Sequence, residues 1–227
     1  KAAFEILPDS ISLPIQGGRL KGLKWIPKAA NPGQLLGRYE PVQEFELAQL
    51  LTTSKVFWDV GAHVGWYSLL AHKKMPEGGQ ICTFEPHPDN IRYLEQHIEL
   101  NQIDNIRLFK VAISSNIGEC LFSGQKQQGQ LSDTGEISVK TTTADTVVQN
   151  IKQAPDLLKV DIEGGEVEFL EGAQTLLRAH RPTIVLSTHG YQKRDACLEH
   201  LKKLGYSFRH IAANKPDGDY VFIATPA

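Results

Sequence analysis

Short, nearly continuous apolar segments recur along this chain. They lie at residues 55–60, 80–85, 106–113, 156–162 and 182–187. Apolar and polar residues do not alternate within them, which is typical of strands covered on both faces of a parallel sheet. Apolar residues at helical spacing occupy the segments between them, at 87–101, 165–180 and 191–205. This alternation of strands and helices predicts an α/β fold with right-handed crossovers.

The C-terminal part of the chain adds detail to this framework. Residues 206–213 and 219–225 are predicted to form an antiparallel hairpin at one edge of the sheet, with a turn at 214–218. Gly172 is expected to divide the helical segment 165–180, and Gly205 is expected to end the last helix. The sheet is therefore predicted to be mixed, with most strands parallel.

Two regions do not fit the repeat. Residues 1–40 are rich in proline and glycine and are predicted to form an irregular extension to the main domain at 41–227, with a strand within 19–26. The polar segment 119–142 is predicted to be an inserted loop, between two short strands. A helix is expected to follow it, with Thr142 and Asp145 spaced as in a capping box.

Composition narrows the class of protein. The 227 residues include 24 Lys and Arg and 26 Asp and Glu, and no basic stripe is visible, so we expect no nucleic-acid partner. No apolar run reaches the roughly 20 residues needed to span a bilayer, and we expect no signal peptide. Three scattered cysteines suit a reducing compartment, so we expect a cytoplasmic protein. The sequence sets no oligomeric state.

The stretch VFWDVGAHVGWYS, at 56–68, predicts a nucleotide site at a strand end. Gly61 and Gly65 follow the first apolar strand, and glycines there let the backbone approach a ligand. Glu85 ends the next strand, 20 residues after Gly65, where a carboxylate can accept hydrogen bonds from both ribose hydroxyls. Asp59 beside the turn disfavours a pyrophosphate, and no P-loop is present. S-adenosylmethionine, which has a sulfonium and no phosphate, fits this pattern.

An ordered set of motifs resembles one known family. The set is DVGAHVGWYS, FEPHPDNIRYLEQHIELN, VAIS, DLLKVDIEGGEVEFLEGA and RPTIVL, within residues 55–205. It is similar to the FkbM family of S-adenosylmethionine-dependent methyltransferases. The resemblance implies the class I methyltransferase fold, a Rossmann-like sheet of seven mostly parallel strands with one antiparallel strand and helices on both faces.

The resemblance also implies a set of cofactor-binding residues. Those expected beside the methionine and sugar are Asp59, Gly61, Ala62 and Gly65, with Trp66, Tyr67 and Ser68 opening the next helix. Those expected around the ribose and adenine are Glu85, Pro86, His87, Val111 and Ala112. Asp161 would lie near the transferable methyl group or the amino group of the cofactor.

The acceptor side departs from the family pattern. Many members carry a glutamate soon after the fifth strand, where this chain has Ser187 and His189. We predict His189 as the general base, because its ordinary pKa of about 6.5 suits proton removal near neutrality, and Asp161 as the second catalytic residue. No metal is expected, the alternative being an Asp161–Glu163 pair. The segment at Tyr39 either folds over the cofactor or starts a helix.

The predicted function is methyl transfer from S-adenosylmethionine to a hydroxyl oxygen of a sugar or natural product. Three alternatives stay open at this point. The first is methylation of nitrogen or nucleic acid, although the Asn/Asp-Pro-Pro-Tyr/Phe segment of amino-methylating enzymes is absent from the sequence. The second is a nicotinamide-dependent oxidoreductase with a Rossmann-like core. The third is a non-catalytic binding module.

Overall fold

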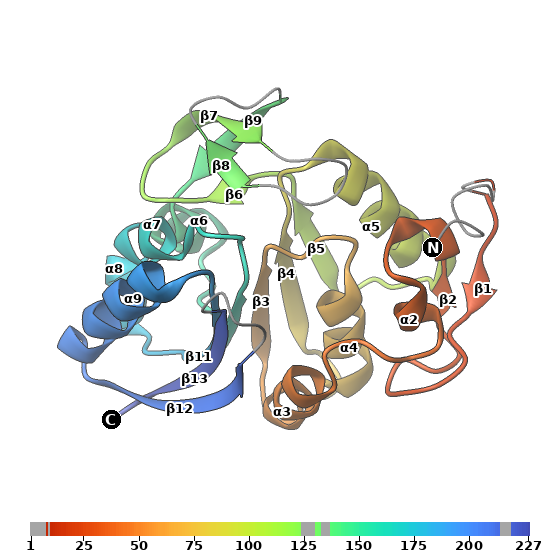
Figure 1. Cartoon of the computed structure of the whole chain (residues 1–227), viewed down its shortest axis with the longest axis horizontal. Coiled ribbons are helices and arrows are strands. Elements are labelled where there is room, and N and C mark those ends of the chain that lie inside the picture. The colour runs from red at the N-terminus through yellow and green to blue at the C-terminus, as the bar shows by residue number, and fades with distance from the viewer. Residues whose placement is uncertain (1–7, 9, 124–129, 133–136, 214–218) are drawn as a thin grey trace.

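A seven-stranded sheet forms the centre of the molecule (Figure 1). The computed structural model describes residue 8 and residues 10–123, 130–132, 137–213 and 219–227. The strand order is β12-β13-β11-β10-β3-β4-β5. The strands are β3 (Val56–Val60), β4 (Gln80–Phe84), β5 (Ile106–Phe109), β10 (Leu157–Val160), β11 (Thr183–Thr188), β12 (Tyr206–Ala213) and β13 (Tyr220–Pro226). Among the strands of this described sheet, β13 alone runs in the direction opposite to the other six, which confirms the predicted fold class.

The strand order reverses between β3 and β10. From β3 the sheet grows one way through β4 and β5, and from β10 it grows the other way through β11. Val60 pairs with Phe84 on one side and with Val160 on the other. The residues that follow these three strands therefore emerge together at one edge. In open α/β sheets this is where ligands bind.

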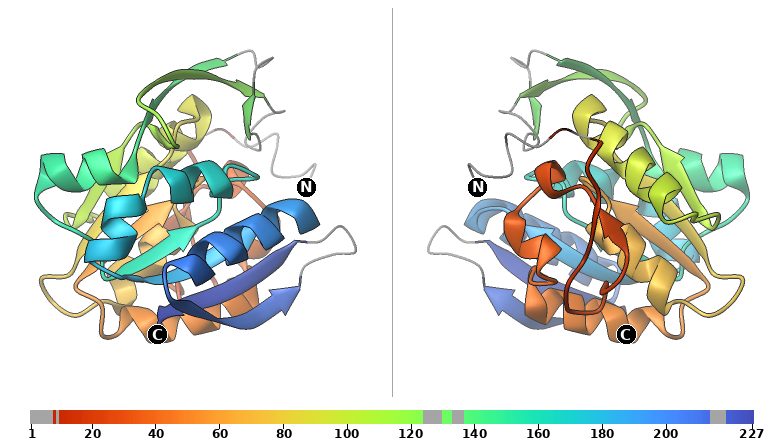
Figure 2. Two further views of the ribbon diagram at one scale, coloured as in Figure 1. Left: turned by 90° about the vertical axis from the view of Figure 1, so that its left-hand side faces the viewer. Right: turned by 90° about the vertical axis from the view of Figure 1, so that its right-hand side faces the viewer.

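Helices cover both faces of the sheet, and the two views of Figure 2 show the two coverings. One face carries α3 (Pro41–Leu51), α4 (Trp66–Lys74) and α5 (Pro88–Leu100), and the other carries α6 (Ala144–Ile151), α7 (Glu166–Glu171), α8 (Gln174–Ala179) and α9 (Tyr191–Lys203). Successive residues of β3 point to opposite faces of the sheet. Phe57 packs in the core under α3, α4 and α5, and Trp58 packs in the core under α6 to α9. This explains why the strands are apolar throughout.

The N-terminal segment lies on the first of these faces, as the right-hand view of Figure 2 shows. Its elements are β1 (Leu13–Pro14), β2 (Lys24–Trp25), the 3₁₀ turn η1 (Pro27–Ala29) and α2 (Pro32–Leu35). β2 confirms the strand predicted within 19–26 but is only two residues long. Trp25 and Ile26 are buried in one core with α3, α4 and α5. A division of the chain at residue 40 stays a prediction.

The single strand predicted at 106–113 is wrong. β5 ends at Phe109, and a tight turn follows in which the Val111 N–H donates to the Phe109 carbonyl (3.0 Å). The chain then leaves the main sheet and enters a second one of order β6-β9-β7-β8, near the upper edge of Figure 1. Its strands are β6 (Ala112–Ile113), β7 (Gly118–Ser123), β8 (Gln130–Ser132) and β9 (Ile137–Thr142). Much of the predicted loop at 119–142 is therefore extended strand.

Helix boundaries follow the sequence except at α6. Gly172 separates α7 from α8, and Gly205 follows α9 with φ +75°, as predicted. The expected Thr142–Asp145 capping box is wrong, because Thr143 is the N-cap and its Oγ1 accepts the Thr146 N–H (3.1 Å). Asp145 instead accepts backbone N–H groups of α8.

Some predictions concern segments that lie outside the described residues. These are the turn at 214–218 and the parts of the polar insertion at 124–129 and 133–136. Within the described ranges, none of the helices has the length and apolar character that crossing a bilayer would require. Cys82 and Cys197 are buried thiols, and a cytoplasmic location stays a prediction.

Candidate active site

A cavity opens at the switch point of the sheet. It holds about 1000 Å³ of space, including its solvent-open mouth. Nine of the predicted cofactor-binding residues line it, namely Gly61, Ala62, Trp66, Tyr67, Glu85, Pro86, Val111, Ala112 and Asp161. The strand ends bring these residues together because Val60, Phe84 and Val160 are in register.

The other predicted positions do not belong to the described lining. They are Asp59, Gly65, Ser68, His87 and His189. Asp59 is fully buried, and its Oδ2 accepts the Ser68 hydroxyl (2.7 Å), which also contacts the Thr83 hydroxyl (2.9 Å). Asp59 and Ser68 therefore lie behind the cavity wall and hold β3, α4 and β4 together.

The two glycines of the opening stretch are required by the packing around them. A Cβ at Gly61 would lie 1.9 Å from the Asp161 carbonyl oxygen, and one at Gly65 would lie 2.3 Å from Leu94 Cδ1. Their φ angles of +81° and +95° are also in the left-handed region. The glycines therefore allow close packing against the residue after β10 and against α5, and their predicted role in letting the backbone approach a ligand stays a prediction.

Glu85 is held in place by protein donors. Its Oε2 accepts the His63 N–H (2.8 Å), and its Oε1 accepts the His87 N–H (2.9 Å) and the Asn90 side-chain amide (3.2 Å). Burial raises the pKa of Glu85 to about 7, although these hydrogen bonds act in the opposite direction. A carboxylate has about four lone-pair positions, so at least one position on Glu85 is left to accept a ligand hydroxyl.

Lys159 is a cavity residue that our sequence analysis missed. It lies in β10, and its Nζ is 3.2 Å from Asp161 Oδ2, 3.9 Å from Asp59 Oδ1 and 4.7 Å from the centre of the Tyr67 ring. Burial lowers the pKa of Lys159, but the nearby carboxylates outweigh burial and raise it. Lys159 is therefore charged. A lysine inside an otherwise apolar strand was the available signal.

The N-terminal segment contributes to the cavity as well. Gln34 and Tyr39 line it, and the Tyr67 hydroxyl donates to Glu40 Oε2 (2.7 Å). Gln34 is 1% exposed, and its Oε1 has no hydrogen-bond partner among the described residues. Burial raises the pKa of Glu40. The segment at Tyr39 thus reaches the cavity, and Pro41 just after it begins α3.

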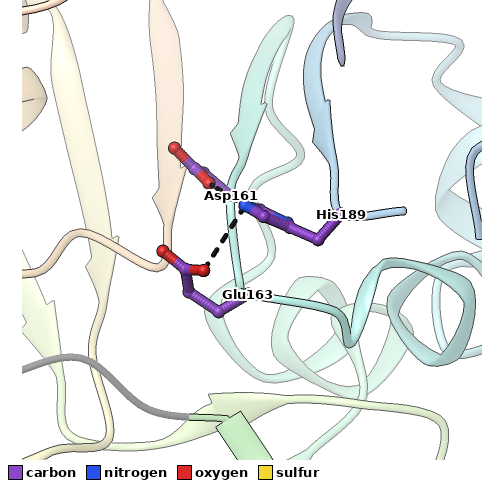
Figure 3. Close-up of side chains that lie close together, drawn as sticks. All are labelled: Asp161, Glu163 and His189. Carbon is purple, nitrogen blue, oxygen red and sulfur yellow. Dashed lines mark ion pairs between the residues drawn. The ribbon is translucent and has the colours of Figure 1, made fainter. Parts of the chain in front are cut away.

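Three side chains meet at the rim of the cavity (Figure 3). Asp161 follows β10, Glu163 lies in the next turn, and His189 follows β11. His189 Nε2 is 3.7 Å from Asp161 Oδ1 and 3.5 Å from Glu163 Oε2. His189 Nδ1 is 2.8 Å from Oε1 of Glu166, a fully buried residue at the start of α7. The sequence does not predict this contact, because it joins residues 23 apart in the chain on different elements.

The charges of this cluster affect the predicted general base. Burial lowers the pKa of His189, but the Glu166 hydrogen bond and the charges of Asp161 and Glu163 raise it, to about 9. Burial raises the pKa of Asp161, but Lys159 and His189 outweigh burial and lower it. A histidine that is protonated near pH 7 is not available to accept a proton. The general-base role of His189 stays a prediction that these charges disfavour.

The cavity wall is acidic overall. Glu85, Asp161 and Glu163 line it together with Lys159, whose charge is shared between Asp59 and Asp161. Such a wall favours ligands with positive charge and hydroxyl groups, and it disfavours a pyrophosphate. Apolar surface from Phe84, Val111 and Ile113 provides a place for a flat ring. The arrangement therefore suits a nucleoside with a cationic side chain.

Comparison with known proteins agrees with this geometry. Residues 59–213 match the family described as Methyltransferase FkbM domain. A curated relative, the hexuronic acid methyltransferase AglP of Haloferax volcanii, is 28% identical over 145 residues, which are 62% of this chain and 59% of the relative. This chain thus spans less than two thirds of that relative's length.

Solved structures share the fold at low sequence identity. Methyltransferase FkbM from Methylobacillus flagellatus superimposes with a TM-score of 0.56 at 19% identity, over 75% of this chain and 43% of that one. An O-methyltransferase from Bacillus cereus, solved in complex with S-adenosylhomocysteine, gives a TM-score of 0.55 at 14% identity, over 84% and 83% of the two chains. The fold, the order of motifs and the match over 59–213 lead to one conclusion: this chain belongs to the FkbM methyltransferase family.

Proposed function

We propose that this protein is an S-adenosylmethionine-dependent methyltransferase that acts on a hydroxyl oxygen of a sugar. The observation that carries the proposal is the convergence of Gly61, Glu85 and Asp161 on one cavity at the switch point of the sheet. Family membership supports the reaction class, and the name of the Haloferax relative supports a sugar acceptor.

The residues present fit this cofactor. Glu85 would accept hydrogen bonds from the ribose hydroxyls, because its carboxylate is fixed by three protein donors at a strand end. Phe84, Val111 and Ile113 would contact the adenine ring. The acidic wall at Asp161 would attract the ammonium and sulfonium charges. A Bacillus cereus protein of this fold was solved with S-adenosylhomocysteine.

The protein's part in the reaction would be alignment and exclusion of water. The bound cofactor supplies a methyl group already activated by its sulfonium. Asp161 and Lys159 would position the donor side, since their side chains form an ion pair (3.2 Å) at the cavity wall. Tyr39 and Gln34 would cover the site from the N-terminal segment. Glu163 and His189, at the rim, would face the acceptor.

Calorimetric titration with S-adenosylhomocysteine and NAD tests the cofactor assignment. We expect saturable binding of S-adenosylhomocysteine and none of NAD, because the acidic wall repels a pyrophosphate. Binding of NAD alone would support the oxidoreductase alternative and contradict the proposal.

A screen of hydroxylated sugars, including hexuronic acids, tests the reaction. Mass spectrometry should find one added methyl group on the acceptor and an equal amount of S-adenosylhomocysteine. Cofactor binding with no methylated product from any sugar would contradict the catalytic proposal and favour a binding module. A methylated RNA or DNA product would contradict the acceptor class.

A further inference from the structure

The rim cluster of Asp161, Glu163 and His189 has the spacing of a metal site. His189 Nε2 lies 3.7 Å and 3.5 Å from the two carboxylate oxygens, and the donor atoms of all three residues lie within 4.8 Å of one another (Figure 3). These separations are too long for direct hydrogen bonds. The separations of 3.5 Å and 3.7 Å are close to the ~3.3–3.6 Å between two tetrahedral ligands that lie about 2.0–2.2 Å from one ion.

The imidazole is oriented for this role. Nδ1 of His189 contacts Oε1 of Glu166 (2.8 Å), and an ionised carboxylate can only accept a hydrogen bond. Nδ1 must therefore carry the hydrogen, which directs Nε2 toward Asp161 and Glu163. Glu166 is itself fully buried and accepts the Gly164 N–H (2.8 Å). A buried carboxylate that fixes the far nitrogen of a histidine is a common second partner at metal sites.

The negative charge around the cluster also favours a bound cation. Asp161, Glu163 and Glu166 contribute three carboxylates around one imidazole. The Lys159 ammonium contacts the other oxygen of Asp161 and also Asp59. A divalent ion at Nε2 would displace the proton that these carboxylates favour there, would balance more of their negative charge than that proton does, and would take the position toward which both carboxylates point.

We propose that Asp161 Oδ1, Glu163 Oε2 and His189 Nε2 bind one divalent cation at the cavity rim, with Glu166 positioning the imidazole. Two oxygen ligands and one nitrogen suit a first-row ion such as Mn²⁺ or Zn²⁺. Three protein ligands leave further positions for ligands, and Asp161 and Glu163 line the cavity. The next assignment rests on the proposed function: the remaining coordination positions of the ion would bind a hydroxyl or carboxylate oxygen of the acceptor. A bound ion makes a hydroxyl more acidic, so His189 is not needed as the general base.

Titration of the full chain with Mn²⁺, followed by calorimetry and by the loss of its free electron-spin resonance signal, tests the site. We expect one saturable site in the wild type. Glu163→Gln and Glu166→Gln should each weaken Mn²⁺ binding by about 10- to 100-fold, and His189→Ala should abolish it. Glu168→Gln, an exposed acid of α7 outside the cluster, should bind like the wild type. The Glu163 side chain is 54% exposed, so its variant is expected to fold.

The proposal is overturned by two results. One is the absence of saturable binding of both Mn²⁺ and Zn²⁺ at millimolar concentrations. The other is equal affinity in the wild type and in folded Glu163→Gln protein. A parallel titration with S-adenosylhomocysteine separates this proposal from the proposed function. Cofactor binding without a cation site would contradict the cation site alone, and a cation site without cofactor binding would contradict the proposed function alone.

Discussion

Gly61 has φ +81°, and its missing Cβ would lie 1.9 Å from the carbonyl oxygen of Asp161. Glycine at this position therefore allows the end of β3 to pack closely against the end of β10, where the cavity forms. Alanine at this position would meet backbone, which cannot move aside as a side chain can. We therefore expect Gly61→Ala to lower the free energy of unfolding by about 3 kcal/mol or more, from backbone strain and overpacking together. Urea unfolding measures this change.

Gly78 is the matched control for Gly61. Its φ is +80°, but a Cβ there would find no atom within 4 Å. Gly78→Ala should therefore show only the cost of the left-handed backbone, about 1–2 kcal/mol. Equal losses in the two variants would contradict the claim that close packing against Asp161 requires Gly61.

Glu85 carries a pH dependence of cofactor binding. Its pKa is raised to about 7 by burial, so the carboxyl is ionised above that pH and becomes protonated below it. Because the ionised form is the better hydrogen-bond acceptor for ribose, we expect the affinity for S-adenosylhomocysteine to fall below pH 7, by at most about tenfold per pH unit. Calorimetry across this range measures it.

Glu85→Gln should remove most of that dependence and weaken binding at pH 8 by about tenfold or more. Glu99→Gln, on the exposed side of α5, should behave like the wild type. A pH profile that is the same in the Glu85→Gln variant would show that another group titrates.

The sequence predicts some site residues better than others, for a physical reason. Glu85 and Asp161 follow apolar strands directly, so the parallel sheet alone places them at one edge. Lys159 and Glu166 act through partners far away in the chain, such as Asp59 and His189. Pairing over such distances depends on strand order and on the angle between elements, which composition and spacing do not encode.

At the scale of elements, the apolar runs predict the central sheet because its strands are buried on both faces. The same signal fails at 106–113, where β5 and β6 are both apolar but belong to different sheets. The break is a backbone turn at Val111, with no glycine or proline to mark it. An apolar run therefore predicts extended strand there without predicting which sheet the chain joins.

Asp145 links two helices and gives a prediction at this scale. Its carboxylate in α6 accepts the N–H groups of Thr175 (2.9 Å) and Leu176 (2.8 Å) in the first turn of α8, whose N-cap residue makes no side-chain capping bond. Removing this cap should cost about 1 kcal/mol of unfolding free energy in Asp145→Ala. Asp145→Asn keeps one acceptor oxygen and should lose less. Urea unfolding of both variants checks this, and an Asp145→Ala variant as stable as the wild type would contradict it.

At the scale of the whole molecule, the N-terminal segment is joined to the core through α5. The neutral His97 ring accepts the Ile26 N–H at Nε2 (3.0 Å), contacts the Val64 carbonyl through Nδ1 (2.8 Å) and stacks on Trp25 at 4.0 Å. Asn101 exchanges two hydrogen bonds with the backbone of Lys24. Because Val64 lies in the loop between β3 and α4, these contacts connect the segment that carries Gln34 and Tyr39 to the cavity loop itself.

This junction makes the fold sensitive to acid. Burial lowers the pKa of His97 to about 4, below the ordinary value of 6.5 that the unfolded chain would have. Between these values the unfolded state binds a proton that the folded state excludes. The stabilisation that neutral His97 gives the fold is therefore complete above about pH 6.5. It is lost as the pH falls toward 4, by about 3 kcal/mol in total.

Urea unfolding from about pH 7.5 to pH 4.5 measures this loss of unfolding free energy. The His97→Gln variant should be less stable at neutral pH, and its unfolding free energy should depend less steeply on pH, by up to one proton. The His180→Gln variant, changed at an exposed position, should keep the pH dependence of the wild type. An unchanged slope in His97→Gln would mean that other groups produce the acid sensitivity.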